Sequence, residues 1–301
     1  MSNDKVTAWR ELSFLLDGLD PERAEDALLA SGALSVTLSD NADQPVLEPR
    51  PGEMPLWQHT RITGLYEGTA DLDIADHMVC DALGLEQLPE SRRSTVDDRD
   101  WSRVWLDHFK PLKFGSRLWI VPTAYAPPEP EALNILLDPG LAFGTGTHPT
   151  TALCLEWLDG LDLEGKVVVD YGCGSGILAI AAAMLGAQEV IATDIDPQAL
   201  TATRDNAQRN KVLNEITTCL PEGLLAAMAE RKADVVVANI LAGPLSELAS
   251  NIEGLLAAGG EIALAGLLDT QAKDVAAAYT TELEVTAERD TWVRLSGQAK
   301  A

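Results

Sequence analysis

The chain has 301 residues, 46% of them hydrophobic, and a formal net charge of −25. This length allows two ordinary domains, and the composition is that of a globular protein with apolar cores. No window approaches the roughly 20 uninterrupted apolar residues that a membrane span needs. Residues 1–5 lack the start of a signal peptide, and the four cysteines are far apart. We therefore expect a cytoplasmic protein with reduced thiols, no metal site and no membrane contact.

The acidic charge is spread over both halves of the chain. Residues 1–95 carry 18 Asp or Glu and 7 Arg or Lys, a net charge of −11, which leaves −14 for the other residues. Proteins that grip duplex nucleic acid usually present a basic surface to the phosphates, so tight binding to naked RNA is not expected. The excess of acid either serves solubility alone or attracts a basic partner such as a ribosomal protein.

The first 95 residues alternate between strand and helix patterns. Apolar, extended segments predict strands at 6–16, 33–38 and 60–66, with a last short strand near 94–96. Periodic apolar residues predict helices at 22–30 and 72–83. The order β-α-β-β-α-β is typical of a small α+β domain of the ferredoxin-like kind, which we place at residues 1–95.

Residues 96–130 are predicted to link two domains. A helix at 100–109 places Trp101 and Trp105 on one face, a spacing that usually reflects packing between domains. A short strand is expected at 117–122, and the Pro-rich run at 126–131 indicates a turn or an extended segment. The second domain is predicted to cover 131–301.

This second domain shows the pattern of a doubly wound α/β sheet. Five apolar strands with helical segments between them predict a parallel sheet covered on both faces, and they lie at 167–170, 190–194, 216–220, 234–238 and 261–265. The last two strands, 283–289 and 292–296, are too close for a helical crossover and must form an antiparallel hairpin. Such a hairpin is a feature of class I methyltransferases.

A glycine-rich turn follows the first of these strands. Asp170 ends the strand, and Gly172, Gly174 and Gly176 lead into an Ala-rich helix. Glycines at this spacing let a ligand lie against the backbone, but G-x-G-x-G differs from the G-x-G-x-x-G of nicotinamide sites. A carboxylate at the mouth of the loop repels a pyrophosphate and suits an ammonium group. Asp170, Gly172 and Gly174 are therefore predicted to contact S-adenosylmethionine, which carries an ammonium and no phosphate.

Two further residues follow strand ends. Asp194 ends the second strand, where an acid accepts hydrogen bonds from ribose hydroxyls, and Asp196 is placed to cap the helix that begins at Pro197. Asn239 follows the fourth strand, where a polar residue holds the acceptor amine in methyltransferases that act on nitrogen. It is followed by Ile, Leu and Ala at 240–242, so no aromatic ring there supports the amine through a cation–π contact.

Residues 137–151 form a second glycine-rich stretch, directly before a helix expected at 149–158. This composition predicts a lid over the cofactor, in which Phe143 offers a ring face and Thr151 a hydrogen-bonding hydroxyl; Thr147 and Thr150 are alternative donors. His148 is either a general base or a residue of the helix start, and the structural interpretation is the commoner one for histidine.

Four segments together resemble the PrmA-type bacterial methyltransferases: 138–151, 170–180, 194–199 and 236–245. The resemblance extends to Glu-Pro-Arg-Pro-Gly-Glu at 48–53 and to the Trp-x3-Trp segment at 101–105, so it covers nearly the whole chain. It implies S-adenosylmethionine-dependent methylation of lysine side chains and the N-terminal amine of large-subunit ribosomal protein L11. It also implies cofactor contacts by Thr151, Gly172, Asp194 and Asn239, and an N-terminal domain that binds the substrate and moves on a flexible linker.

The residues leave other functions open. An RNA or small-molecule nitrogen methyltransferase has the same scaffold, but an RNA enzyme is expected to carry a basic face. A non-catalytic assembly factor that only binds the cofactor is disfavoured by Asp170, Asp194 and Asn239. A nicotinamide oxidoreductase is disfavoured by the loop spacing. Since no dedicated base stands out, we expect in-line displacement that is driven mostly by positioning of the neutral amine.

Overall fold

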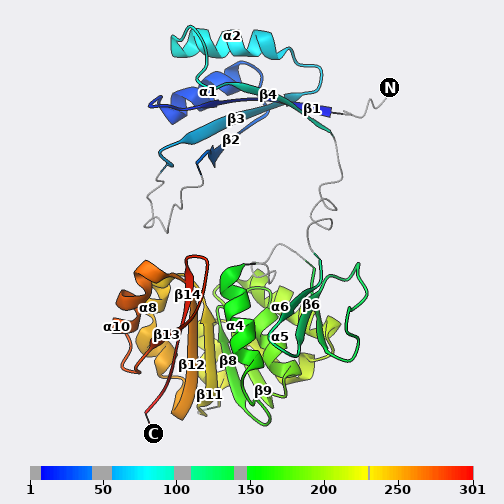
Figure 1. Ribbon diagram of the computed structural model, residues 1–301, viewed down its shortest axis with the longest axis vertical. Coiled ribbons are helices and arrows are strands. Elements are labelled where there is room, and N and C mark those ends of the chain that lie inside the picture. The colour runs from blue at the N-terminus through cyan, green and yellow to red at the C-terminus, as the bar shows by residue number, and fades with distance from the viewer. Residues whose placement is uncertain (1–7, 43–55, 98–109, 139–147, 230, 301) are drawn as a thin grey trace. The chain divides into compact units, whose positions relative to one another are not determined.

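The computed structural model describes residues 8–42, 56–97, 110–138, 148–229 and 231–300. The chain forms two compact units, Met1–Ser102 and Arg103–Ala301, which are coloured blue to cyan and green to red in Figure 1. Each unit has its own apolar core. Among the described residues, no helix is long and apolar enough to cross a membrane.

The N-terminal unit is an antiparallel sheet with two helices. Its elements are β1 (Ala8–Leu15), α1 (Pro21–Ala30), β2 (Ser35–Asp40), β3 (Thr60–Glu67), α2 (Leu72–Leu83) and β4 (Arg92–Asp97). The strand order is β2-β3-β1-β4, and all three pairings are antiparallel. Asp20 and Asp71 cap the two helices through their carboxylates, and Gly84 ends α2 in a left-handed conformation. The predicted elements of this unit are all present, including the short last strand.

The second unit contains a small sheet that the sequence predicted only in part. Its strands are β5 (Leu112–Phe114), β6 (Leu118–Val121) and β7 (Leu133–Leu136), and β6 lies between the other two. The prediction for 117–122 is confirmed as β6, whereas β5 and β7 were not predicted. The predicted helix at 100–109 and its tryptophans lie outside the described residues.

A seven-stranded sheet forms the centre of this unit. Its strands are β8 (Val167–Tyr171), β9 (Glu189–Thr193), β10 (Ile216–Cys219), β11 (Ala233–Asn239), β12 (Leu256–Leu268), β13 (Glu284–Arg289) and β14 (Trp292–Gln298), in the order β10-β9-β8-β11-β12-β14-β13. The first five are parallel, and β14 inserts antiparallel between β12 and β13. The parallel sheet with a C-terminal hairpin, the arrangement of class I methyltransferases, is therefore confirmed.

Helices cover both faces of this sheet, as Figure 1 shows. One face packs against α4 (Pro149–Asp159), α5 (Ile177–Met184) and α6 (Pro197–Arg209). The other face packs against α7 (Leu224–Ala227), α8 (Ala242–Glu247), α9 (Ala249–Glu253) and α10 (Ala272–Ala277). Short 3-10 turns lie at Leu213–Glu215, Pro221–Gly223 and Asp269–Gln271. Side chains of a strand alternate between the two faces, which is why Val168 and Val169 belong to different cores.

Candidate active site

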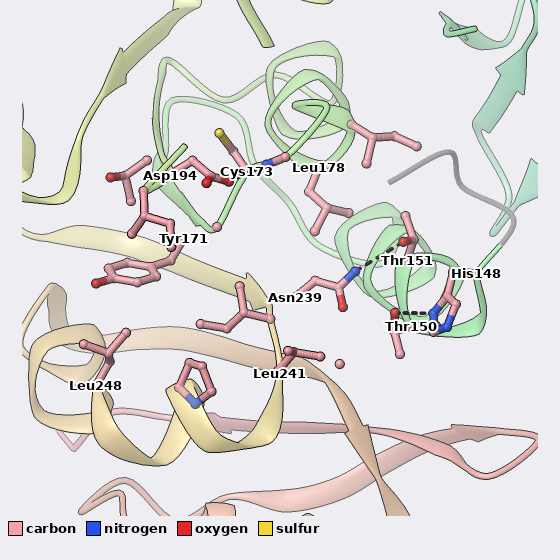
Figure 2. A pocket seen from close by; sticks show the side chains of 18 of the residues that line it. His148, Thr150, Thr151, Tyr171, Cys173, Leu178, Asp194, Asn239, Leu241 and Leu248 are labelled. Atoms are coloured by element: carbon pink, nitrogen blue, oxygen red, sulfur yellow. Dashed lines mark hydrogen bonds between the residues drawn. The ribbon is translucent and has the colours of Figure 1, made fainter. Parts of the chain in front are cut away.

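A cavity of about 600 Å³ opens at the carboxyl ends of β8, β9 and β11. The strand order reverses between β8 and β11, the position where open α/β sheets bind their ligands. The structure brings five of the predicted site residues together in its lining, and these are Thr151, Gly172, Gly174, Asp194 and Asn239. Figure 2 shows how several of them surround the cavity. Phe143 and Thr147 lie outside the described residues.

The glycine-rich turn after β8 brings bare backbone into the cavity. Gly172 has φ +81°, and a Cβ there would lie 2.2 Å from Ile240 Cγ2, so any other residue would strain the backbone and displace Ile240. The amides of Gly172 and Cys173 donate to the carbonyl oxygen of Thr193 at 2.8 and 3.0 Å. The turn is thus tied to the end of β9, and Gly172, Cys173 and Gly174 line the cavity.

Helix α6 supports the same turn from behind, a contribution that the sequence analysis missed. Thr203 Oγ1 donates to the carbonyl oxygen of Gly174 at 3.1 Å, and Asn206 Nδ2 donates to that of Ser175 at 2.9 Å. A Cβ on Gly176 would lie 2.7 Å from Thr203 Cγ2. Because Thr203 and Asn206 lie one helical turn apart, a polar pair at this spacing on the next helix was the available signal.

Asp194 joins the glycine turn to the end of β9. Its Oδ2 accepts a hydrogen bond from Gly174 N at 2.9 Å, and its Oδ1 accepts one from Asp196 N at 3.0 Å. A carboxylate oxygen has two acceptor positions, so both oxygens are able to accept a further hydrogen bond from a vicinal diol. Asp196 accepts from Gln198 N at 2.8 Å and caps α6, as predicted.

Asp170 does not lie at the mouth of the loop, and that expectation needs correction. The side chain is 1% exposed, is not part of the cavity lining, and accepts a hydrogen bond from Ala179 N at 2.9 Å through Oδ2. Its Oδ1 has no partner among the described residues. The alternation along β8 turns Asp170 toward α5, beneath the glycine turn. Burial raises the pKa of Asp170 to about 7, against the lowering effect of the Ala179 hydrogen bond, and the Asp194 charge adds to the rise.

Thr151 fixes the orientation of Asn239. Asn239 Nδ2 donates to Thr151 Oγ1 at 3.2 Å, and Thr151 is fully buried in the first turn of α4. Figure 2 shows this bond as a dashed line, with the amide oxygen of Asn239 turned away from Thr151. An amide oxygen in that position is an acceptor for the N–H of an incoming amine.

His148 lies at the start of α4, where its ring acts as the helix N-cap. Nδ1 accepts from Thr150 N at 3.4 Å and lies 2.8 Å from Thr150 Oγ1, a contact drawn in Figure 2. Nδ1 must be unprotonated to accept from Thr150 N, so this cap favours a neutral ring with its proton on Nε2. Burial also lowers the pKa of His148. Of the two interpretations, the helix start is the one that this geometry supports.

Trp292 is a cavity residue that the sequence analysis missed. It begins β14 and lines the same cavity as Asn239. Its ring meets the His148 ring edge to face, with centroids 4.8 Å apart and planes at 70°. No local sequence pattern predicts that Trp292 lines the cavity, because its place there depends on the insertion of β14 beside β12.

Sequence comparison decides the family. A profile described as "Ribosomal protein L11 methyltransferase (PrmA)" matches residues 8–300. The chain belongs to the ribosomal protein L11 methyltransferase family. Family members from Pseudomonas aeruginosa and Pseudomonas putida are each 52% identical to it, over 97% of this chain and 99% of theirs. A ribosomal protein L11 methylase structure from Lactobacillus delbrueckii subsp. bulgaricus is 33% identical, with a TM-score of 0.57 over 64% of this chain and all of that one.

S-adenosylmethionine is the cofactor of this methyltransferase. The size and the lining residues of the cavity suit this molecule. The volume of about 600 Å³ lies in the range that holds molecules of this size. Gly172 and Gly174, which carry no side chains, line the cavity, and the oxygens of Asp194 suit a ribose. Leu178, Ile195 and Pro221 supply apolar walls.

Proposed function

We propose that the chain transfers methyl groups from S-adenosylmethionine to amino groups of large-subunit ribosomal protein L11, namely lysine side chains and the N-terminal amine. The observation that carries this proposal is the convergence of the glycine turn, Asp194 and Asn239 on one cavity. The glycine turn and Asp194 suit the methyl donor, S-adenosylmethionine, and the Asn239 amide suits an acceptor amine. The family membership of the chain supports the choice of protein substrate.

On the donor side, Asp194 would accept hydrogen bonds from the ribose hydroxyls, and the backbone of Gly172 and Gly174 would contact the rest of the cofactor. Thr151 acts here by holding Asn239 and by closing the wall at the start of α4. When bound, S-adenosylmethionine supplies an electrophilic methyl group on sulfur. Asp170 supports the turn from below by accepting from Ala179 N.

On the acceptor side, the amine must be neutral before it attacks, because a lysine ammonium ordinarily titrates near 10.4 and has no lone pair. Asn239 Oδ1 accepts an N–H from the neutral amine, which favours that form and directs its lone pair toward the methyl carbon. Nδ1 of His148 is engaged by Thr150, so His148 is not assigned the role of base. The proton leaves to water, and the main contribution of the site is positioning.

The N-terminal unit is proposed to recognise the substrate. We assign residues 1–95 to this domain, 96–130 to a linker and 131–301 to the catalytic domain. The strand order β2-β3-β1-β4 with two helices supports the ferredoxin-like assignment. The net charge of −11 on residues 1–95 suits a basic protein and does not suit direct tight binding of nucleic acid.

The test is transfer of labelled methyl groups to purified L11, with intact ribosomal RNA and a small amine as parallel acceptors. We expect label in the protein, on amino groups that mass spectrometry identifies, and loss of label with Asp194→Ala or Asn239→Ala. His148→Asn, which preserves a helix cap, is expected to keep most of kcat at saturating L11. Label in RNA alone, or none in L11 despite cofactor binding, would overturn the proposal.

A further inference from the structure

The acceptor side of the cavity lacks an aromatic residue where nitrogen methyltransferases often carry one. Ile240, Leu241 and Ala242 follow Asn239, so this segment provides no ring for a cation–π contact with an amine. Yet a tryptophan lines the cavity from a different strand, since Trp292 belongs to its wall. The cavity therefore has an aromatic ring, but Trp292 lies 53 positions after Asn239 in the sequence.

The sheet explains how two distant residues reach one wall. Asn239 lies beside Ala265 where β11 pairs with β12, and Trp292 lies beside Leu268 where β14 pairs with β12. The two residues therefore flank the carboxyl end of β12. Between these pairs the register of β12 and β14 shifts, and Gly266 with φ +91° lines the cavity there. Such irregularities redirect side chains next to sites.

Contacts with α4 hold the hairpin that carries Trp292. Arg294, two residues further along β14 and 8% exposed, donates through Nη1 to the carbonyl oxygen of Leu153 at 2.7 Å. Arg289 of β13 pairs with Glu156 of α4 at 2.7 Å. The edge-to-face contact between Trp292 and His148 completes the attachment. Both strands of the hairpin are therefore tied to α4, and the indole lies on the cavity wall beside the His148 ring.

We propose that Trp292 provides the aromatic face that receives the acceptor amine and retains its methylated product, and that His148 is the positioning residue that holds this face. The inference rests on the proposed function. A neutral His148 suits the role, because it supports the indole without placing a second positive charge beside a cationic cofactor. Protonation at Nδ1 would also remove the cap that Thr150 N requires.

Repeated methylation of one amine requires that the product stays in the cavity between transfers, and the Trp292 ring is suited to retain it. The lone pair of the amine nitrogen forms the new N–C bond, the methyl–sulfur bond breaks, and its electron pair remains on sulfur. The product is a methylammonium ion, which must release a proton to water before a second transfer. Aromatic faces hold alkylated ammonium ions by cation–π attraction. Trp292 thus keeps the product in place between transfers.

The experiment compares Trp292→Phe and Trp292→Leu with the full-length wild-type protein. Trp292→Leu is expected to raise KM for L11 about 3- to 30-fold, the range that a partly desolvated cation–π contact covers. Trp292→Phe keeps an aromatic ring, so its KM for L11 should lie between those of the wild type and Trp292→Leu. The Kd of S-adenosylmethionine, measured by calorimetry, should change less than about twofold, since cavity walls on the donor side are untouched. Mass spectrometry should show more singly methylated amines with Trp292→Leu.

A matched control is Trp119→Leu. Trp119 lies in β6, faces Lys113 Nζ at 5.6 Å, and is not part of the cavity lining. This change should leave both KM for L11 and the distribution of methylation states as in the wild type. His148→Asn keeps the cap but removes the ring that supports Trp292, so it should reproduce part of the rise in KM with kcat nearly unchanged.

The outcomes separate this inference from the proposed function. An unchanged KM and an unchanged distribution of methylation states in Trp292→Leu would overturn the role of Trp292. A weaker Kd for the cofactor with an unchanged KM for L11 would assign the ring to the donor side and overturn it as well. Failure of the wild-type protein to methylate L11 would instead refute the proposed function.

Discussion

Replacement of Asp194 by Asn tests the donor side of the site most directly. The carboxylate accepts from Gly174 N and Asp196 N, one hydrogen bond per oxygen. An amide of the same shape has one acceptor oxygen, so its NH2 group must face one of these two N–H donors. The variant therefore loses one hydrogen bond within the protein, and it loses the negative charge and one acceptor toward the ribose.

The loss in affinity follows from these contacts. A hydrogen bond to a charged group contributes about 1.5–3 kcal/mol. Loss of one such bond to the ribose and weakening of the second together cost about 2–3 kcal/mol, or roughly 30- to 150-fold in the Kd of S-adenosylmethionine. The measurement is isothermal titration calorimetry of the full-length protein at constant pH and salt.

The matched control is Asp196→Asn, two residues further on. Asp196 caps α6, and Asn is an equally good N-cap, so the Kd should change less than about twofold. A change of less than about fivefold in Asp194→Asn would refute the assignment of the ribose to Asp194. Equal losses in both variants would show that the segment acts through local stability, without direct contact.

Three further predictions concern the backbone, the acceptor side and pH. Gly172→Ala should destabilise the protein more than Gly165→Ala in urea unfolding. Both glycines have positive φ, but only a Cβ at 172 meets another atom, so about 1–3 kcal/mol of overpacking should add to about 1–2 kcal/mol of backbone strain; equal losses would contradict the clash. Thr151→Val should lower kcat/KM about tenfold by releasing Asn239, with little further loss when it is combined with Asn239→Ala; additive effects would show that the two residues act independently. Because burial raises the pKa of Asp170 to about 7, the folded protein holds a proton that the unfolded chain releases near pH 4. The free energy of unfolding should therefore fall as pH rises from 4 to 7, by up to about 1.4 kcal/mol per pH unit. Asp170→Asn should remove this pH dependence. If the variant's free energy of unfolding changes with pH as that of the wild type does, another group is responsible.

The central strands were predictable because their signals are local. A run such as Val167–Tyr171 is apolar, bounded by turn residues and buried on both faces, and the hairpin followed from a connection too short for a helix. The strands β5 and β7 contain three and four residues, but length alone does not explain why they were missed, since β6 also has four. Asn210 helps to define β7, since its side chain exchanges two hydrogen bonds with the backbone of Leu136, 74 residues away. No sequence window contains both partners.

Some residues of the candidate site were likewise predictable from the sequence, and others were not. Gly172, Gly174 and Asp194 follow strand ends, and Asn239 is the last residue of β11. The carboxyl ends of parallel strands meet at one edge of the sheet, so the convergence of these residues on the cavity was foreseeable. The position of Asp170 was misjudged because one step along a strand reverses the face to which a side chain points. Trp292 was missed because strand order, and not sequence distance, brings it to the cavity.

The insertion of β14 has a consequence for biosynthesis. The ribosome makes the strands that carry the glycine turn and Asp194 early, whereas β14 is the last strand to be made. Until β14 emerges, β13 has no neighbour in the sheet, so the hairpin must dock late and against a strand already in place, a non-local step that is intrinsically slow. A nascent chain therefore acquires the glycine turn, Asp194 and Asn239 before the part of the cavity wall that Trp292 forms.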